Sequence, residues 1–237
     1  ATGYGTVYFV EEMLKSRGQT LEGKVCTVSG SGNVAIHAIE KLHQLGARVV
    51  ACSDSGGVIH DPRGIDLSVL RQIKEVERKR ISRYVDFRGH AQYLQGGCIW
   101  EIPCDVALPC ATQNELDEAS ARMLVQNGCI AVGEGANMPT TPGGVRVFQA
   151  ADVAYAPGKA ANAGGVATSA LEMQQNASRD AWTFEYTERR LHEIMRNIHR
   201  DCFETAEEFG SPGNYVIGAN IVGFRRVAEA MLAFGVV

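Results

Sequence analysis

Three small residues at fixed spacing, directly after a short apolar run, are the clearest sign of chemistry in this sequence. The run includes Val25 and Val28, and the pattern Gly30-x-Gly32-x-x-Ala35 follows it. Between a strand and a helix, such glycines permit a tight turn and let the backbone approach a pyrophosphate, while the third small residue lets the helix pack closely on the strand. The free N–H groups of the helix N-terminus favour a phosphate. The pattern predicts a dinucleotide site.

The residues around this pattern have the periodicity that the site requires. Apolar side chains at helical spacing follow the turn, at Ala35, Ile36, Ala38, Ile39, Leu42 and Leu45. A second apolar strand over residues 49–54 ends in Asp54, about twenty residues after the glycine turn. An acid at this position usually accepts hydrogen bonds from the ribose 2′-hydroxyl, which favours NAD, and it would repel a 2′-phosphate.

Four residues near Asp54 favour the opposite cofactor. The hydroxyls of Ser53 and Ser55 and the cations of Lys74 and Arg80 suit a dianionic phosphate. The alternative is that Lys74 and Arg80 are ordinary charges on a solvated helix over residues 68–82. The residues alone leave NADP and NAD both open.

The elements that must position this site alternate along the chain. Short apolar segments at 106–109, 129–132 and 152–155 read as buried strands, each followed by a loop rich in Gly, Asn, Thr or Ser. Helical patterns cover residues 6–15, 68–82, 115–126, 187–209 and 217–234. We therefore predict an α/β fold with a doubly wound, mostly parallel sheet and additional C-terminal helices. Because loops after parallel strands meet at one edge, a single large cleft is expected there.

Composition excludes several other classes. The 237 residues carry a formal net charge of −4 and no basic patch, which argues against a nucleic-acid partner. No apolar run approaches the roughly 20 residues that span a bilayer. The seven cysteines form no Cys-x-x-Cys pair and read as reduced, mostly buried thiols of a cytoplasmic protein. The six histidines share no helix face at ligand spacing, so we expect no metal site.

Five ordered motifs carry a family resemblance over essentially the whole chain. They are ATGYG (1–5), GSGNVA (30–35), LPCATQNE (108–115), EGANMPTT (134–141) and PGKAANAGGVATS (157–169). Together they resemble the bacterial-type hexameric NADP-dependent glutamate dehydrogenases. The resemblance implies that residues 1–237 form the family's second domain, which binds the cofactor and includes the C-terminal helices of about 187–237.

This resemblance also implies what the chain lacks. The sequence begins at Ala1 without an initiating Met, as an excised piece would. The family's first domain, which carries the catalytic lysine and aspartate and most subunit contacts, is expected to be absent. The chain should therefore contain no catalytic residue, and should bind cofactor without turning over glutamate. The full-length enzyme would be a homohexamer, whereas this chain alone can be a monomer.

The resemblance assigns roles residue by residue. Gly30, Ser31, Gly32 and Asn33 would hold the pyrophosphate and adjoining ribose. Thr2 would contact the nicotinamide amide; the ring and its ribose would be lined by Ala111, Thr112 and Asn137, with Asn162 near the reacting carbon. Ser169 would bind the distal carboxylate of glutamate or 2-oxoglutarate. Lys74 and Arg80 occupy places similar to basic residues of NADP-using relatives, which favours NADP over NAD.

Simpler interpretations remain open at several of these positions. Ser169 opens a predicted helix, where it can act as an N-cap, and Asn162 can belong to a simple turn. Lys159 can attract an anion or be an ordinary loop lysine. For the whole chain, the alternatives are a stand-alone nucleotide-binding regulatory module and an NAD-dependent amino-acid dehydrogenase of another specificity. The absence of a local base or nucleophile constellation favours the regulatory module.

Overall fold

A single seven-stranded sheet organises the computed structural model, which describes residues 1–235. The strand order is β4-β3-β2-β1-β5-β6-β7. The strands are β1 (Val25–Val28), β2 (Arg48–Asp54), β3 (Gly57–His60), β4 (Gln92–Gln95), β5 (Val106–Leu108), β6 (Ala131–Gly133) and β7 (Ala154–Ala156). β2, β1, β5, β6 and β7 are parallel, and only β3 and β4 join antiparallel. The predicted doubly wound, mostly parallel sheet is confirmed.

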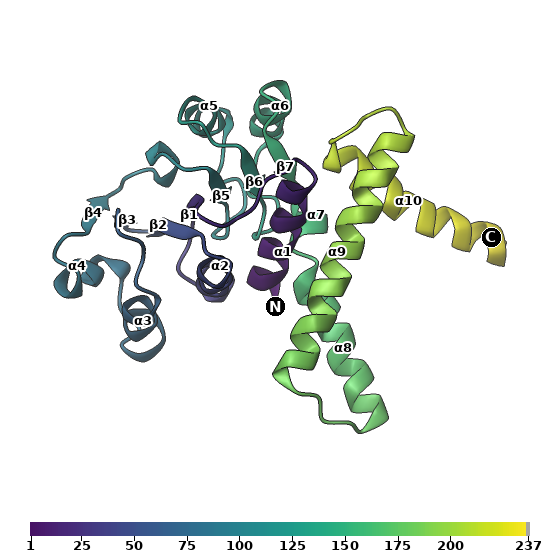
Figure 1. Ribbon diagram of the computed structural model, residues 1–237, viewed down its shortest axis with the longest axis horizontal. Coiled ribbons are helices and arrows are strands. Elements are labelled where there is room, and N and C mark those ends of the chain that lie inside the picture. Colours follow the sequence, from purple (N-terminus) through teal and green to yellow (C-terminus); the bar gives the residue numbers. More distant parts are fainter. Residues whose placement is uncertain (236–237) are drawn as a thin grey trace.

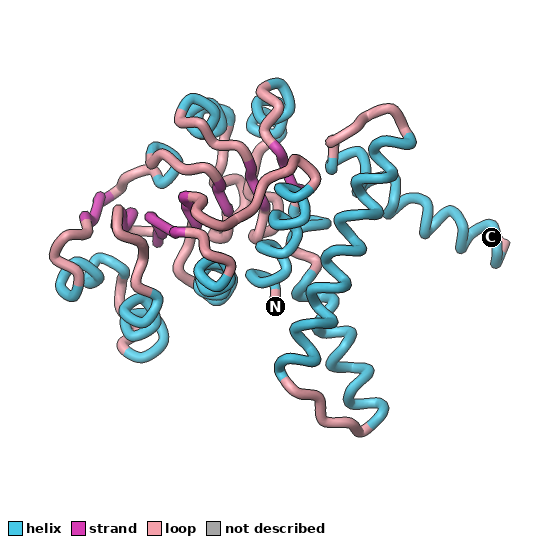
Figure 2. The backbone as a smooth tube through the Cα atoms, viewed as in Figure 1, coloured by secondary structure: helices cyan, strands magenta, loops and turns pink. Residues whose placement is uncertain are grey.

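Helices cover both faces of this sheet (Figures 1 and 2). One face carries α1 and α2, the other α5 and α6, and the long helix α9 lies beside α1. The helices are α1 (Thr2–Lys15), α2 (Asn33–Gln44), α3 (Leu67–Arg71), α4 (Tyr84–Phe87), α5 (Glu118–Gln126), α6 (Pro142–Ala150), α7 (Gly158–Ala161), α8 (Gly164–Ser178), α9 (Phe184–Glu208) and α10 (Tyr215–Phe234).

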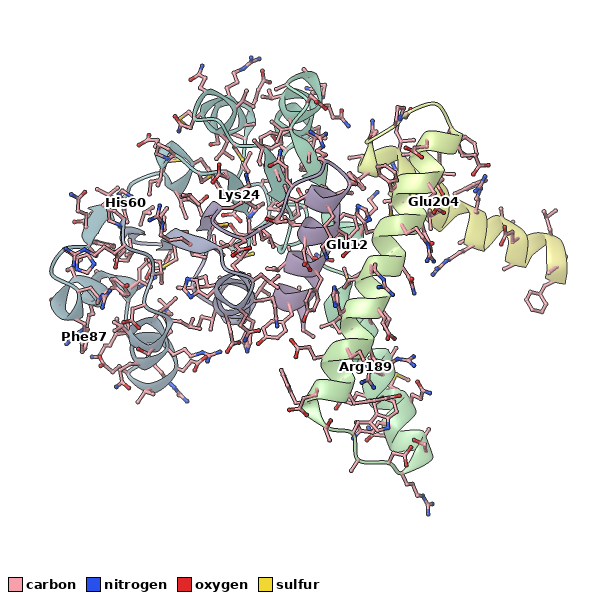
Figure 3. All side chains as sticks on the ribbon, in the orientation of Figure 1. Glu12, Lys24, His60, Phe87, Arg189 and Glu204 are labelled. Carbon is pink, nitrogen blue, oxygen red and sulfur yellow. The ribbon has the colours of Figure 1, made fainter. Side chains whose placement is uncertain are left out.

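Burial on both faces explains why the central strands contain small apolar residues almost throughout. Every residue of β5, β6 and β7 is buried, so these strands show no polar alternation. The core continues from the sheet through α1 into α9, where Leu191 and Met195 are buried. By contrast, α10 projects away from the sheet and exposes Phe224, Leu232 and Phe234 (Figure 3).

The prediction of one helix over residues 68–82 is wrong. α3 ends at Arg71, a π-helical turn follows at Gln72–Val76, and Arg78 adopts a positive φ of 53°. A single helix over this range would place Val76 on the same side as the buried Ile73, three residues earlier, but Val76 is 69% exposed. The chain turns back because the backbone N–H of Ile81 donates to the Asp54 carboxylate at the end of β2 (3.1 Å). A long-range hydrogen bond thus overrides the local helical pattern.

The helix expected over residues 115–126 begins three residues later than the sequence suggested. Asp117 is its N-cap, with Oδ1 accepting the N–H of Ser120 (2.8 Å), because an aspartate satisfies a free N–H group of the first turn. Glu115 is therefore left outside α5, and its carboxylate turns toward the loop that follows β5. The sequence also missed β4 and α6.

A buried histidine predicts how stability depends on pH. His199 is 6% exposed, lies against Phe9 and Phe203, and shares a 3.0 Å hydrogen bond with the Tyr215 hydroxyl. Burial lowers its pKa to about 4, from 6.5 for an exposed histidine. Between these values the unfolded chain binds more protons, so the free energy of unfolding falls as the pH falls, by about 2 kcal/mol from this residue at pH 5.

Urea unfolding of the wild-type chain and of His199→Gln at pH 7.5 and pH 5.0 measures this contribution. The glutamine can keep a hydrogen bond to Tyr215 but does not titrate. We expect the wild-type chain to lose about 2 kcal/mol more than the variant between the two pH values. Equal losses in both proteins would mean that His199 is not the titrating group.

Candidate cofactor cleft

The sheet reverses its winding direction between β1 and β5, and the candidate site lies at that point. From β1 the chain continues to β2 on one side, whereas β5, β6 and β7 follow on the other. Ligands of such sheets bind in the crevice beyond the carboxyl ends of the two diverging strands. A cleft of about 630 Å³ lies there, lined by Thr2, Val34, Cys110, Ala111, Thr112, Gln113, Gly135, Ala136, Asn137, Asn162, Gly165 and Val166.

The glycine turn has the geometry that a pyrophosphate requires. Gly30 has a φ of +87°, and a Cβ there would lie 3.1 Å from the Cys110 carbonyl oxygen, so the turn favours glycine. Gly32 is the N-cap of α2, and a Cβ placed on it would meet no protein atom within 4 Å. Open space therefore faces the N-terminus of a 12-residue helix, where N–H groups attract a phosphate. Ser31 and Asn33 flank Gly32 in the same turn.

The side chains of Ser53 and Asp54, the last two residues of β2, accept hydrogen bonds from backbone N–H groups. The Asp54 side chain is 6% exposed, with Oδ1 accepting the N–H of Gly56 (2.8 Å) and Oδ2 that of Ile81 (3.1 Å). The Ser53 hydroxyl accepts the N–H of Gly30 (2.9 Å) and so braces the glycine turn. The carboxylate that favoured NAD in the sequence thus holds its own turn at Gly56 and the segment at Ile81, 27 residues later.

Arg80 and the Ser55 hydroxyl lie next to this carboxylate, and Lys74 bonds to the backbone just before Arg80. Arg80 is 65% exposed, donates to the Ser55 hydroxyl and stays 3.9 Å from Asp54 Oδ2. Lys74 donates to the carbonyl oxygen of Lys79, the residue before Arg80 (3.2 Å). Arg80 lies in the extended segment before a 3-10 turn, not on a solvated helix as the alternative interpretation held. The set of groups fits a phosphate monoester, which Arg binds through several N–H groups.

The loops after β5, β6 and β7 form the other end of the cleft. Ala111 and Thr112 are exposed at its wall. The Asn162 side-chain amide donates to Asn137 Oδ1 (2.9 Å) and to the Ala136 carbonyl oxygen (3.2 Å), which joins the β6 and β7 loops. Asn162 therefore ties two loops together, which goes beyond the simple turn that the sequence left open.

The start of α1 reaches the same cleft. A Cβ on Gly165 would lie 2.3 Å from Thr2 Oγ1, so this glycine permits α1 to approach α8 closely. The cleft thus brings together Thr2 and residues more than a hundred positions later in the chain.

Ser169 lies on α8, one turn beyond Gly165. Its hydroxyl is exposed and donates to the Gly165 carbonyl oxygen (3.3 Å). The N-cap of α8 is Ala163, so the interpretation of Ser169 as an N-cap is wrong. Residues four apart share a helix face, which places Ser169 on the side of α8 that carries Gly165.

Sequence reasoning missed two carboxylates that brace the cleft, the half-buried Glu115 and the buried Glu134. Glu115 Oε1 accepts hydrogen bonds from the Ser29 hydroxyl (2.9 Å) and from the N–H groups of Ala111 (3.0 Å) and Thr112 (3.3 Å). Burial raises the pKa of Glu115, and these bonds oppose the rise. Glu134 is more deeply buried, at 3% exposed. A charged residue directly after a buried strand was the available signal for Glu134.

Among residues 1–235, one group of three side chains has metal-ligand spacing, Glu11, Glu12 and His192, and both of its carboxylates are paired with Lys15. Within the same range, no helix combines the length and the apolar character needed to cross a membrane. The expectation that the protein binds no metal stays a prediction.

A parallel sheet with a glycine turn at its switch point defines the class of Rossmann-type dinucleotide-binding folds. The family model described as Glutamate/Leucine/Phenylalanine/Valine dehydrogenase matches residues 1–235, and the chain belongs to this family. The NADP-specific glutamate dehydrogenase of Helicobacter pylori strain 26695 is 53% identical over 243 residues, and that of Escherichia coli K12 is 54% identical over 239. An NAD(P)-specific glutamate dehydrogenase of Xylanibacter ruminicola is 54% identical over 239 residues.

These matches cover the whole chain but only part of each relative. The chain spans about half the length of the curated relatives, 54% of the Helicobacter pylori protein and 53% of the Escherichia coli protein. Plasmodium falciparum glutamate dehydrogenase superposes with a TM-score of 0.97 at 45% identity, over 100% of this chain and 52% of that one. A hetero-hexameric glutamate dehydrogenase of Thermus thermophilus superposes with a TM-score of 0.85 at 25% identity, over 100% of this chain and 54% of that one.

Proposed function

We propose that this chain is the NADP(H)-binding part of a glutamate dehydrogenase and prefers NADP(H) to NAD(H). The observation that carries the cofactor preference is the Asp54 carboxylate. It accepts the backbone N–H groups of Gly56 and Ile81, and its side chain is only 6% exposed, so a ribose hydroxyl has little access to it. Arg80 lies beside it and donates to the Ser55 hydroxyl, and Lys74 bonds to the backbone just before Arg80, so two cations and a hydroxyl would be at hand for a 2′-phosphate. The names of the NADP-specific relatives support the same preference.

The proposed reaction is the reversible conversion of glutamate to 2-oxoglutarate and ammonia. Bound NADP supplies the hydride acceptor. Gly30, Ser31, Gly32 and Asn33 would anchor the pyrophosphate, and the loops bearing Ala111, Thr112, Asn137 and Asn162 would orient the nicotinamide ring, with Thr2 at its amide. Ser169 would donate a hydrogen bond to the distal carboxylate of the substrate. The chain's contribution is to hold the two reacting carbons in contact, which lowers the entropic cost of reaction.

The remaining catalytic groups are proposed to lie outside this chain. The family resemblance assigns the catalytic lysine and aspartate to the other domain, and the lining of the cleft includes no lysine, aspartate or glutamate among the described residues. In the whole protein, we propose assembly into a homohexamer. The isolated chain should therefore bind cofactor without producing 2-oxoglutarate.

Fluorescence titration of the purified chain with NADPH and with NADH tests the proposal, with a glutamate oxidation assay on the same sample. We expect NADPH to bind at least about tenfold more tightly than NADH, because charge-assisted hydrogen bonds to a phosphate are worth about 1.5–3 kcal/mol. We expect no turnover. Equal or tighter NADH binding would instead support an NAD-dependent dehydrogenase. Turnover by the chain alone would show that a catalytic group lies within it, with Lys159 the first to replace.

A further inference from the structure

Glu134 is a buried carboxylate without a cationic partner at the centre of the strand-end loops. It follows β6 directly and is 3% exposed. Among the ion pairs of residues 1–235, none includes Glu134. A buried charge is costly unless hydrogen bonds replace its hydration. Its partners therefore explain why the fold tolerates it.

Both oxygens of Glu134 accept hydrogen bonds from neighbouring segments. Oε1 accepts the N–H of Thr140 (3.1 Å) and the Tyr155 hydroxyl (2.5 Å), while Oε2 accepts the N–H of Gly158 (2.6 Å). Thr140 ends the loop after β6, Tyr155 is in β7, and Gly158 is the first residue of α7. One carboxylate thus connects the β6 loop, β7 and the start of α7.

These connections reach the nicotinamide end of the cleft. α7 ends at Ala161, and Asn162 follows as its C-cap, with its amide bonded to Ala136 and Asn137 of the β6 loop. Gly158 also lets α7 approach the β6 loop closely, because a Cβ there would lie 3.0 Å from the Ala136 carbonyl oxygen. Glu134 at the start of α7 and Asn162 at its end thus fix the loops after β6 and β7 relative to each other.

We propose that Glu134 is a positioning residue that sets the nicotinamide end of the cleft by holding the β6 and β7 loops together. The proposal rests on the proposed function, because it assigns the nicotinamide to this end. Glu134 does not line the cleft, so it acts through Asn137 and Asn162 and not by touching the cofactor. The adenine end, with Lys74 and Arg80, lies on the other side of the glycine turn and does not depend on it.

Glu134 and Glu115 should respond differently to replacement by glutamine, because their hydrogen bonds are distributed differently over the two carboxylate oxygens. A glutamine at 134 must place its NH₂ group against the N–H of either Gly158 or Thr140, because each oxygen faces a group that can only donate. The hydrogen bonds of Glu115 all go to Oε1, so a glutamine at 115 can keep them and turn its NH₂ to the Oε2 position. The same substitution should therefore disrupt one site and spare the other.

The experiment compares two ligands on the purified 237-residue chain and three variants, Glu134→Gln, Glu115→Gln and Tyr155→Phe. NADPH occupies both ends of the cleft, and adenosine 2′,5′-bisphosphate occupies the adenine end alone. In Glu134→Gln we expect NADPH binding to weaken at least about tenfold, because a buried donor is left unpaired, and binding of the bisphosphate to change less than about twofold. Glu115→Gln and Tyr155→Phe leave a side-chain oxygen acceptor for each of these backbone N–H groups, so they should weaken NADPH binding by no more than about threefold.

Each other outcome would overturn the proposal. Unchanged NADPH binding in Glu134→Gln would show that the carboxylate does not set this end of the cleft. An equal loss of both ligands, including loss through unfolding, would assign Glu134 to general stability. If Glu115→Gln weakens NADPH binding as much as Glu134→Gln does, the arrangement of hydrogen bonds on the Glu134 oxygens is not the cause of the weaker binding. Failure of the wild-type chain to bind NADPH would overturn the proposed function, and this inference with it, before any variant is measured.

Discussion

Replacing Arg80 with alanine is expected to weaken NADPH binding by about 10- to 100-fold and to leave NADH binding within about twofold. The guanidinium is 65% exposed and, among residues 1–235, bonds to the Ser55 hydroxyl and lies 3.9 Å from Asp54 Oδ2, so it is available to a 2′-phosphate. A bidentate contact between Arg and phosphate supplies a charge-assisted hydrogen bond that NADH cannot receive. Fluorescence titration with both cofactors measures the difference.

Arg83→Ala is the matched control for the loss of one positive charge. Arg83 is in the same segment but pairs with Glu77 (3.9 Å) and Asp86 (3.5 Å). Both variants change the net charge equally, and we expect Arg83→Ala to alter NADPH affinity less than about twofold, because exposed ion pairs contribute little. If the two variants weaken NADPH binding alike, the effect is long-range and Arg80 is not a phosphate ligand.

The second large effect is expected at Gly32, where alanine should abolish most dinucleotide binding without destabilising the fold. An added Cβ meets no protein atom within 4 Å, and the φ of −89° is open to any residue. The space is therefore free for a ligand, and a methyl group would hold the pyrophosphate away from the N-terminus of α2. We expect NADPH and NADH to bind at least about tenfold more weakly, with the free energy of unfolding changed by less than about 1 kcal/mol.

Gly89→Ala provides the comparison for Gly32→Ala. Gly89 also has no atom within 4 Å of its would-be Cβ, and it lies between α4 and β4, away from the cleft. Thermal melting and cofactor titration of both variants separate binding from stability. Retention of full NADPH affinity in Gly32→Ala would show that the pyrophosphate does not approach this turn.

Several parts of the site could be derived from the sequence because local rules determine them. The glycine turn between β1 and α2 is one, since its residues are contiguous and only small side chains fit the backbone path. The central parallel strands are another, because burial on both faces leaves short apolar runs that stand out from the helices around them. Their convergence on one cleft then follows from the rule that ligands bind at the carboxyl ends of such strands.

Other features depend on partners that are distant in the sequence. Asp54 seemed suited to a ribose hydroxyl, yet its carboxylate accepts the N–H of Ile81, a residue 27 positions away. Ile81 belongs to the range 68–82, where the sequence predicts one helix and the structure has an α-helix that ends at Arg71. Glu115 looked like the first residue of a helix, but the Ser29 hydroxyl and two loop N–H groups hold it at the cleft.

The sequence by itself therefore determined the sheet and the glycine turn, because contiguous residues and their periodicity specify these, and its ordered motifs indicated the family. Only the tertiary structure decided what each polar side chain near the cleft does. A carboxylate or hydroxyl will bond to whichever donor the fold brings within reach, and for Asp54, Ser53, Glu115 and Glu134 that donor is a backbone group of the surrounding loops. Arg80 stays available to a ligand because its side chain is 65% exposed and lies 3.9 Å from a carboxylate that already accepts two backbone N–H groups.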